Sequence, residues 1–138
     1  MDRTLVQNVA RLVGIVFLLV GIAGFIPGVT TNLYDGLEFA GNDGNAELLG
    51  IFQVSVLHNI VHGLFGLAGL ALAATASGAR TYLIGGGAIY LALAGLGIVG
   101  GDWLPADNAD NWLHLLLGAG MIGLGVVTTR ESRVASTA

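Results

Sequence analysis

The sequence contains no cysteine and no lysine, and only 10% of its 138 residues are charged. The absence of cysteine excludes disulfides, thiolate catalysis, thiolate-bound metals and covalent attachment of a c-type haem. The basic residues are five arginines, set against nine carboxylates in a chain of formal net charge −4. Because nucleic-acid binding needs clustered positive charge, this composition predicts no nucleic-acid partner.

Hydrophobic residues make up 54% of the chain and 23 residues are glycine, whereas about a quarter of the residues in a soluble domain are charged. The composition therefore predicts an integral membrane protein whose first partner is the lipid bilayer. Four apolar stretches are each long enough to cross about 30 Å of hydrocarbon: about 9–27, 56–76, 81–101 and 111–129. Residues 1–138 are thus predicted to form one all-α domain, a polytopic four-helix transmembrane bundle in the cell membrane.

The connections between the predicted spans carry most of the charge. Residues 28–55 are predicted to be an outer acidic loop with a short segment packed on the bundle, and Ser77–Arg80 a turn. With both termini inside, all five arginines lie inside, and seven of the nine carboxylates lie in the two outer loops. The positive-inside rule therefore predicts an N-in/C-in topology, with Tyr82 as an aromatic residue at the inner interface.

A polar stretch, His58-Asn-Ile-Val-His62, stands in otherwise apolar surroundings, and much of it recurs near the fourth span. Asn59, His62 and Gly66 have counterparts in Asn111, His114 and Gly118. In the preceding spans, Gly21-Ile-Ala-Gly24 is similar to Gly97-Ile-Val-Gly100. These matches predict two parallel helical-hairpin repeats, related by a pseudo-twofold axis along the membrane normal.

Glycines populate all four predicted spans. Small residues let membrane helices approach closely, because lipid provides no hydrophobic drive for their association. Gly66, Gly69 and Gly118 are therefore predicted to pack helices together. Other glycine-rich faces are predicted to meet a protein partner or a second copy of the chain.

Two segments carry a family resemblance: Leu48-Leu-Gly-Ile-Phe-Gln-Val54 with Leu57-His-Asn-Ile-Val-His62, and Asp107-Asn-Ala-Asp-Asn-Trp-Leu-His114. They resemble the hallmarks of domain-of-unknown-function family 4383, a group of small four-helix bacterial membrane proteins, over about residues 3–129. Where members of that family typically carry Asn-Pro, this chain has Ser55-Val56. The resemblance implies a fold and a topology but no activity.

The polar residues of the second and fourth spans admit three interpretations. In the structural one, the Asn59 amide donates to His114 and the Asn111 amide donates to His62, which cross-links the helices. In the second, His62 and His114 are the axial ligands of a b-type haem that transfers electrons. In the third, His58, His62 and His114 bind zinc or copper, with Asp107 or Asp110 as an added carboxylate ligand.

The structural interpretation is favoured, because an HxxxH pair alone is a weak metal signal and only one matched histidine pair is present. We therefore expect a small non-enzymatic membrane protein without a cofactor, acting as a scaffold or accessory subunit of a membrane complex. The alternative is a haem or metal protein that transfers electrons through His62 and His114.

Overall fold

The computed structural model describes residues 3–41, 43–99 and 108–137 and is mostly helical. Four long helices and one short helix are present in the described part: α1 (Leu5–Ala23), α2 (Leu33–Gly36), α3 (Val56–Leu72), α4 (Ala76–Val99) and α5 (Asn108–Thr137). Between α1 and α3 lie three short strands: β1 (Thr30–Thr31), β2 (Glu47–Leu48) and β3 (Phe52–Gln53).

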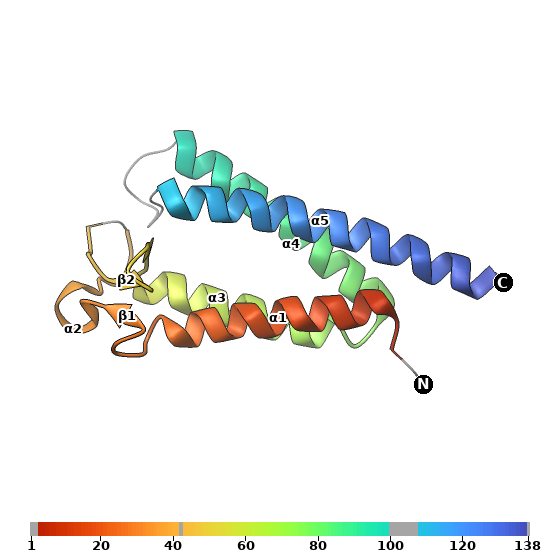
Figure 1. The fold of residues 1–138 in the computed structure, drawn as a ribbon, viewed down its shortest axis with the longest axis horizontal. Helices are drawn as coiled ribbons and strands as arrows, with labels where there is room; N and C mark the ends of the chain where they lie inside the picture. Colours follow the sequence, from red (N-terminus) through yellow and green to blue (C-terminus); the bar gives the residue numbers. More distant parts are fainter. Residues whose placement is uncertain (1–2, 42, 100–107, 138) are drawn as a thin grey trace.

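The four long helices are arranged as two pairs (Figure 1). α1 packs mainly along α3, and α4 packs mainly along α5, with fewer contacts between the two pairs. The strands lie at one end of the molecule, whereas the N-terminus and the end of α5 lie at the other. The chain therefore runs along the long axis of the molecule four times.

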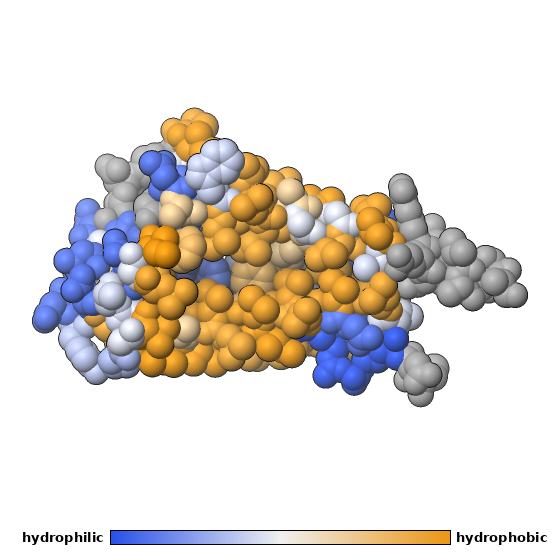
Figure 2. Space-filling model, in the orientation of Figure 1, coloured by the Kyte–Doolittle hydropathy of each residue, from blue (hydrophilic) through white to orange (hydrophobic). Residues whose placement is uncertain are grey.

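Three helical segments are long and apolar enough to cross a membrane: α1, α4 and the part of α5 from Asn108 to Thr129. α3 is also apolar, but it has only 17 residues. Figure 2 shows an apolar band over the middle of the bundle, with hydrophilic residues gathered at the end that carries the strands. This surface fits a membrane protein, since large apolar side chains on every long helix are exposed.

The start of α1 is tied to the end of α3. Gln7 accepts hydrogen bonds from the backbone and the hydroxyl of Thr4, at 3.1 and 3.0 Å. The Gln7 amide donates to the carbonyls of Ala73 and Ala74, at 3.1 and 2.9 Å. The Gln7 side chain thus caps the start of α1. It also binds two carbonyls at the end of α3 that have no intrahelical partner.

The predicted turn at Ser77–Arg80 is wrong, because α4 already begins at Ala76. The Thr75 hydroxyl accepts a hydrogen bond from the backbone of Gly78 at 3.0 Å, so Thr75 caps the helix. The residues between α3 and α4 are therefore only Ala73–Thr75. Ser and Gly favour turns, but here they occupy the first turn of a capped helix.

The segment between α1 and α3, predicted to be an outer loop, contains a sheet that the all-α prediction lacked. Its three antiparallel strands follow the order β1-β2-β3, with Leu48 paired to Thr30 on one side and to Phe52 on the other. Leu49 and Gly50 make the tight turn between β2 and β3, with φ values of +56° and +68°. Each strand has two residues, which is too short for the alternating pattern by which strands are predicted.

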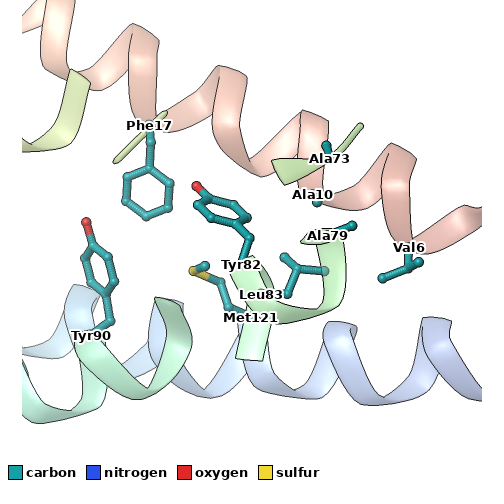
Figure 3. Close-up of a cluster of buried hydrophobic side chains, with 9 residues drawn as sticks. All are labelled: Val6, Ala10, Phe17, Ala73, Ala79, Tyr82, Leu83, Tyr90 and Met121. Carbon is teal, nitrogen blue, oxygen red and sulfur yellow. The ribbon is translucent and has the colours of Figure 1, made fainter. Parts of the chain in front are cut away.

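A small apolar core fastens this sheet to the bundle. Ala46, Leu48 and Val54 are buried there, and Val20 and Ala23 of α1 pack against them. The main core lies farther along the bundle (Figure 3) and consists of Val6, Ala10, Phe17, Ala73, Ala79, Tyr82, Leu83, Tyr90 and Met121.

The main core includes Tyr82, which was predicted to lie at the membrane interface. Only 3% of Tyr82 is exposed, and its ring lies against Gly69, where a Cβ atom would stand 2.5 Å from the ring. The interface prediction is therefore wrong. Gly69 leaves the space that this ring fills.

Candidate functional site

The polar stretch forms the first two turns of α3, directly after the sheet. Ser55 caps the helix, because its hydroxyl accepts a hydrogen bond from the backbone of His58 at 3.1 Å. This cap starts α3 at Val56 and places His58, Asn59 and His62 near the sheet. No proline is needed at this position for the helix to start.

Three histidines from two helices meet at this end of the bundle. The rings of His58 and His62 stack, with centroids 4.3 Å apart and planes 5° apart. The ring of His114 on α5 lies 6.3 Å from that of His58. His62 and His114 are each only 7% exposed. The three histidines singled out in the sequence therefore form one largely buried cluster.

The hydrogen bonds of His62 define its tautomer. Its Nδ1 lies 3.1 Å from the carbonyl oxygen of His58, so Nδ1 carries the proton and donates. Its Nε2 is then an acceptor for the hydroxyl of Tyr90, 3.5 Å away.

Tyr90 on α4 is a member of this cluster that sequence reasoning missed. Its ring centroid lies 6.2 Å from His62 and 5.2 Å from His114. The signal was a four-residue spacing, since Tyr82, Gly86, Tyr90 and Ala94 lie along one buried face of α4.

The haem interpretation does not fit this arrangement. A bis-imidazole haem needs one nitrogen of each histidine directed at a common iron, with room for a flat ring. Here Nε2 of His62 is directed at Tyr90, whose ring contacts both histidines, and Phe17 lies 5.1 Å from Tyr90 and 5.6 Å from His62. Aromatic side chains therefore occupy the space beside the two histidines.

For the metal interpretation, the three histidines lie near one another, but they are not arranged as ligands of one ion. Among the described residues, no three His, Asp or Glu side chains converge on a point where a metal ion could sit as they stand. Asp110, in the first turn of α5, is buried at 2% exposure. Asp107 lies outside the described residues.

The two asparagines lie against glycines rather than against the histidines. Asn59 is 2% exposed, and its side chain occupies the position next to Gly24 where a Cβ atom would otherwise stand. Asn111 is placed in the same way against Gly97. Each asparagine thus faces the first helix of its own pair, α1 or α4.

This orientation leaves polar atoms without partners. Nδ2 of Asn59, Oδ1 of Asn111 and Nδ1 of His114 are buried and have no hydrogen-bond partner in the described part of the chain. The expected bond from the Asn59 amide to His114 is therefore not seen. Both ring nitrogens of His62 are engaged elsewhere, so an Asn111 bond to His62 is not seen either.

Glycines set the closest approach within each helix pair. A Cβ atom on Gly14 would stand 2.9 Å from the carbonyl oxygen of Gly66, and one on Gly87 would stand 2.7 Å from that of Gly118. Gly69, the third glycine predicted to pack helices, receives the ring of Tyr82 from α4, and its backbone also lies 3.2 Å from where a Cβ atom on Gly14 would stand.

The matching contacts occur at constant spacing along the chain. Gly14 and Gly87 are 73 positions apart, as are Gly24 and Gly97, whereas Asn59 and Asn111 are 52 apart, as are Gly66 and Gly118. The sequence comparison paired Gly21 with Gly97. In the structure Gly21 lies against the backbone of Asn59 and Gly63, so the contact of Gly97 matches that of Gly24.

Comparison with the curated proteins finds no match, and comparison with the solved structures also finds none. The model of the family described as a domain of unknown function (DUF4383) matches residues 7–127. This range includes the three-stranded sheet, the histidine cluster and both glycine contacts. The match confirms the resemblance stated for the two histidine segments, and the chain belongs to the DUF4383 family.

Proposed function

We propose that this protein is a small non-enzymatic subunit of the cell membrane that acts by packing against other transmembrane helices, as a scaffold or accessory subunit. The observation that carries the proposal is the exposed face of α4. A stripe of small residues runs along that face at alternating spacings of four and three positions, beside the exposed Ile89 and Leu96: Thr81, Gly85, Ala88, Ala92 and Gly95. Space is open above Gly85 and Gly95, where an added Cβ atom would meet nothing within 4 Å.

The exposed face of α1 provides the contrast. Its exposed residues are large and apolar: Leu12, Ile15, Val16, Leu19 and Ile22. Lipid tails accommodate such side chains, whereas small residues favour close packing of one helix on another. The two faces therefore differ in the neighbour that they suit, lipid for α1 and a helix for α4.

The same device holds the bundle together internally. Gly14 and Gly66 join α1 to α3, and Gly87 and Gly118 join α4 to α5, with backbone against backbone. Repeating such an arrangement on an outer face gives a surface that a second copy of the chain or a partner subunit can cover.

We also propose that all four long helices cross the membrane, with both termini inside, and that the two pairs arose from one hairpin by duplication. The shared spacings of 73 and 52 support the duplication. α3 is at the lower limit of length for a span, which is about 17 residues. Its apolar sequence and its alignment along α1 support a crossing.

Site-directed photo-cross-linking tests the association. The chain lacks cysteine, so Ala88→Cys gives a single attachment point for a thiol-reactive photo-cross-linker. Ile15→Cys is the matched control, because Ile15 lies 73 positions before Ala88 and faces outward on α1. Each variant is labelled in its native membrane and illuminated, and the products are identified by mass spectrometry.

Specific products from Ala88→Cys support the proposal, and their mass distinguishes the two kinds of neighbour. A product of twice the chain mass identifies a second copy, and a product of another mass identifies a partner. If Ala88→Cys yields only lipid adducts, or the same products as Ile15→Cys, the proposed function is overturned.

A further inference from the structure

We propose that the turn between β2 and β3 lies in the bilayer, with the side chains of Leu49 and Ile51 among the lipid chains of the leaflet at the sheet end of the bundle. Leu49 is 65% exposed and Ile51 is 54% exposed, although both side chains are large and apolar. They flank Gly50, the glycine of the turn. The turn therefore presents an apolar tip to the surroundings of the molecule.

The sheet lies beside the last turn of α1 rather than wholly beyond it. Leu48 of β2 is buried in the small core against which Val20 and Ala23 of α1 pack. The backbone N–H of Leu49 donates to the carbonyl of Val29 at 2.8 Å. The turn is thus fastened close to the end of α1, at the edge of a helix that is apolar enough to cross a membrane.

The exposed apolar surface of α1 continues to this place. Ile22 on α1 is 50% exposed, and Phe25 and Ile26, which directly follow the helix, are 42% and 43% exposed. The carbonyl of Ile26 accepts a hydrogen bond from the backbone of Val29 at 3.2 Å, and Val29 in turn holds Leu49. Figure 2 shows that the apolar band extends up to the end that carries the strands. The tip therefore adjoins the surface that faces lipid.

The length of α3 supports the same position. α3 has 17 residues, which at a rise of 1.5 Å per residue span about 25 Å, whereas the hydrocarbon of a bilayer is about 30 Å thick. The residues next to the ends of α3 therefore occupy the remaining depth when the helix crosses. At the sheet end, these residues belong to the hairpin of β2 and β3.

The backbone of the turn suits an apolar environment. Hydrocarbon offers no hydrogen bonds, so an N–H group without a partner is costly there. The N–H of Leu49 is bound by the carbonyl of Val29, and the N–H groups of Gly50 and Ile51 donate to carbonyls of β2 at 3.3 and 3.2 Å. All three donors of the tip are satisfied within the chain.

The conformation of Leu49 is a further argument. Its φ of +56° lies in the left-handed region, which is costly for leucine, and Asn-Gly is the usual pair in a turn whose two central residues have positive φ. Because most of the side chain is exposed, the chain itself offsets little of that cost. Removal of the side chain from water by lipid would offset it.

Fluorescence quenching tests the position of the turn. Leu49→Cys and Ile51→Cys are each labelled with an environment-sensitive fluorophore, and the protein is reconstituted in phosphatidylcholine vesicles. One quencher is a lipid with a spin label on its acyl chain, and the other is iodide on both sides of the membrane. Leu19→Cys on the exposed face of α1 is the lipid-facing reference, and Asp35→Cys on the exposed surface of α2 is the water-facing one.

The proposal predicts that both probes at the turn are quenched by the spin-labelled lipid more than Asp35→Cys, and by iodide less. Leu49→Asn supplies a second variant, because asparagine tolerates the left-handed conformation and keeps the turn while it removes the apolar side chain. In the Leu49→Asn background, the probe at Ile51→Cys should show weaker quenching by lipid and stronger quenching by iodide.

Two results overturn the proposal. Quenching by iodide equal to that of Asp35→Cys would place the turn in water, and protection from both quenchers would show that a protein covers it. Lack of lipid quenching at Leu19→Cys would instead overturn the membrane setting on which the inference rests. None of these results bears on association through α4.

Discussion

The two helix pairs share their closest contacts and differ in the residues around them. Gly66 on α3 lies against Leu18 and Gly14 of α1, and Gly118 on α5 lies against Leu91 and Gly87 of α4. Each pair also holds an asparagine against a glycine: Asn59 against Gly24, and Asn111 against Gly97. Backbone approach and the asparagine position are therefore what the two pairs have in common.

The differences lie in connection, chemistry and length. In the first pair, the connection between α1 and α3 is long enough to form a three-stranded sheet. Where α1 has Phe17, α4 has Tyr90, which reaches His62. α3 ends at Leu72, and Gln7 donates to the carbonyls of Ala73 and Ala74 just after it, whereas α5 continues to Thr137. The comparison indicates that glycine contacts set how closely the two helices of each pair pack. The polar side chains differ between the pairs at a few facing positions.

The largest effect is expected from filling the shared glycine contacts. A Cβ atom on Gly66 would stand 2.5 Å from the backbone nitrogen of Leu18, and one on Gly118 would stand 2.8 Å from the carbonyl oxygen of Gly87. Gly66→Val and Gly118→Val should each lower the free energy of unfolding by about 3 kcal/mol or more, because backbone atoms cannot give way as side chains do. Denaturation in detergent, followed by circular dichroism, measures the loss.

Glycines on open faces of the same helices are the controls. Gly63 and Gly120 have nothing within 4 Å of an added Cβ atom. Gly63→Val and Gly120→Val should therefore change the stability by less than about 1 kcal/mol. Equal losses at all four positions would show that the backbone contacts do not hold the pairs together.

The next effect concerns the two buried asparagines. Asn59→Ala and Asn111→Ala should each destabilise the protein by about 1–2 kcal/mol, because each leaves a space beside its glycine. Asn59→Leu should have a smaller effect, since it keeps the volume and removes a buried amide nitrogen that has no partner in the described structure. The same unfolding assay compares the three variants, and a loss at only one asparagine would break the equivalence of the pairs.

A smaller effect is expected at the end of the bundle opposite the sheet, and only in the first pair. Gln7→Leu removes the donor to the carbonyls of Ala73 and Ala74 and should cost about 1 kcal/mol. Hydrogen exchange should then quicken in the last turn of α3 and remain unchanged in α5. Asn8→Leu, at an exposed neighbouring position, is the control. Equal hydrogen-exchange rates in the two variants would show that Gln7 does not cap the end of α3.

The smallest effect is expected from Tyr90→Phe, which gives α4 the residue that α1 has at the matching position. The hydrogen bond to His62 is 3.5 Å long, so its loss should cost less than about 1 kcal/mol. Nitrogen NMR of the imidazoles should show a changed shift for Nε2 of His62 and little change for His114. An unchanged His62 signal would mean that the bond does not form in solution.

The family, the apolar helices and the histidine positions were predictable from the sequence because each has a strong local signal. The register between the two pairs was not, because Gly21 and Gly24 lie about one helical turn apart and either can be matched to Gly97. That is why Gly21, rather than Gly24, was paired with Gly97.

The remaining misses depend on tertiary contacts. The orientation of Asn59 depends on the space beside Gly24, and the burial of Tyr82 depends on Gly69 of another helix. No pattern within one helix carries that information. The strands were missed because two residues cannot show an alternation.

The central claim is that both pairs cross the membrane in the same direction, and α3 is the helix on which that claim depends. Cysteine accessibility tests it in intact cells, because single cysteines can be placed in a chain that has none. Tyr34→Cys, Thr75→Cys and Asn108→Cys put exposed thiols before α3, after α3 and at the start of α5. We predict that a membrane-impermeant maleimide labels Tyr34→Cys and Asn108→Cys from outside, and labels Thr75→Cys only after the cells are opened. Labelling of Thr75→Cys in intact cells together with Tyr34→Cys would contradict the four-span account, because α3 would then not cross the membrane.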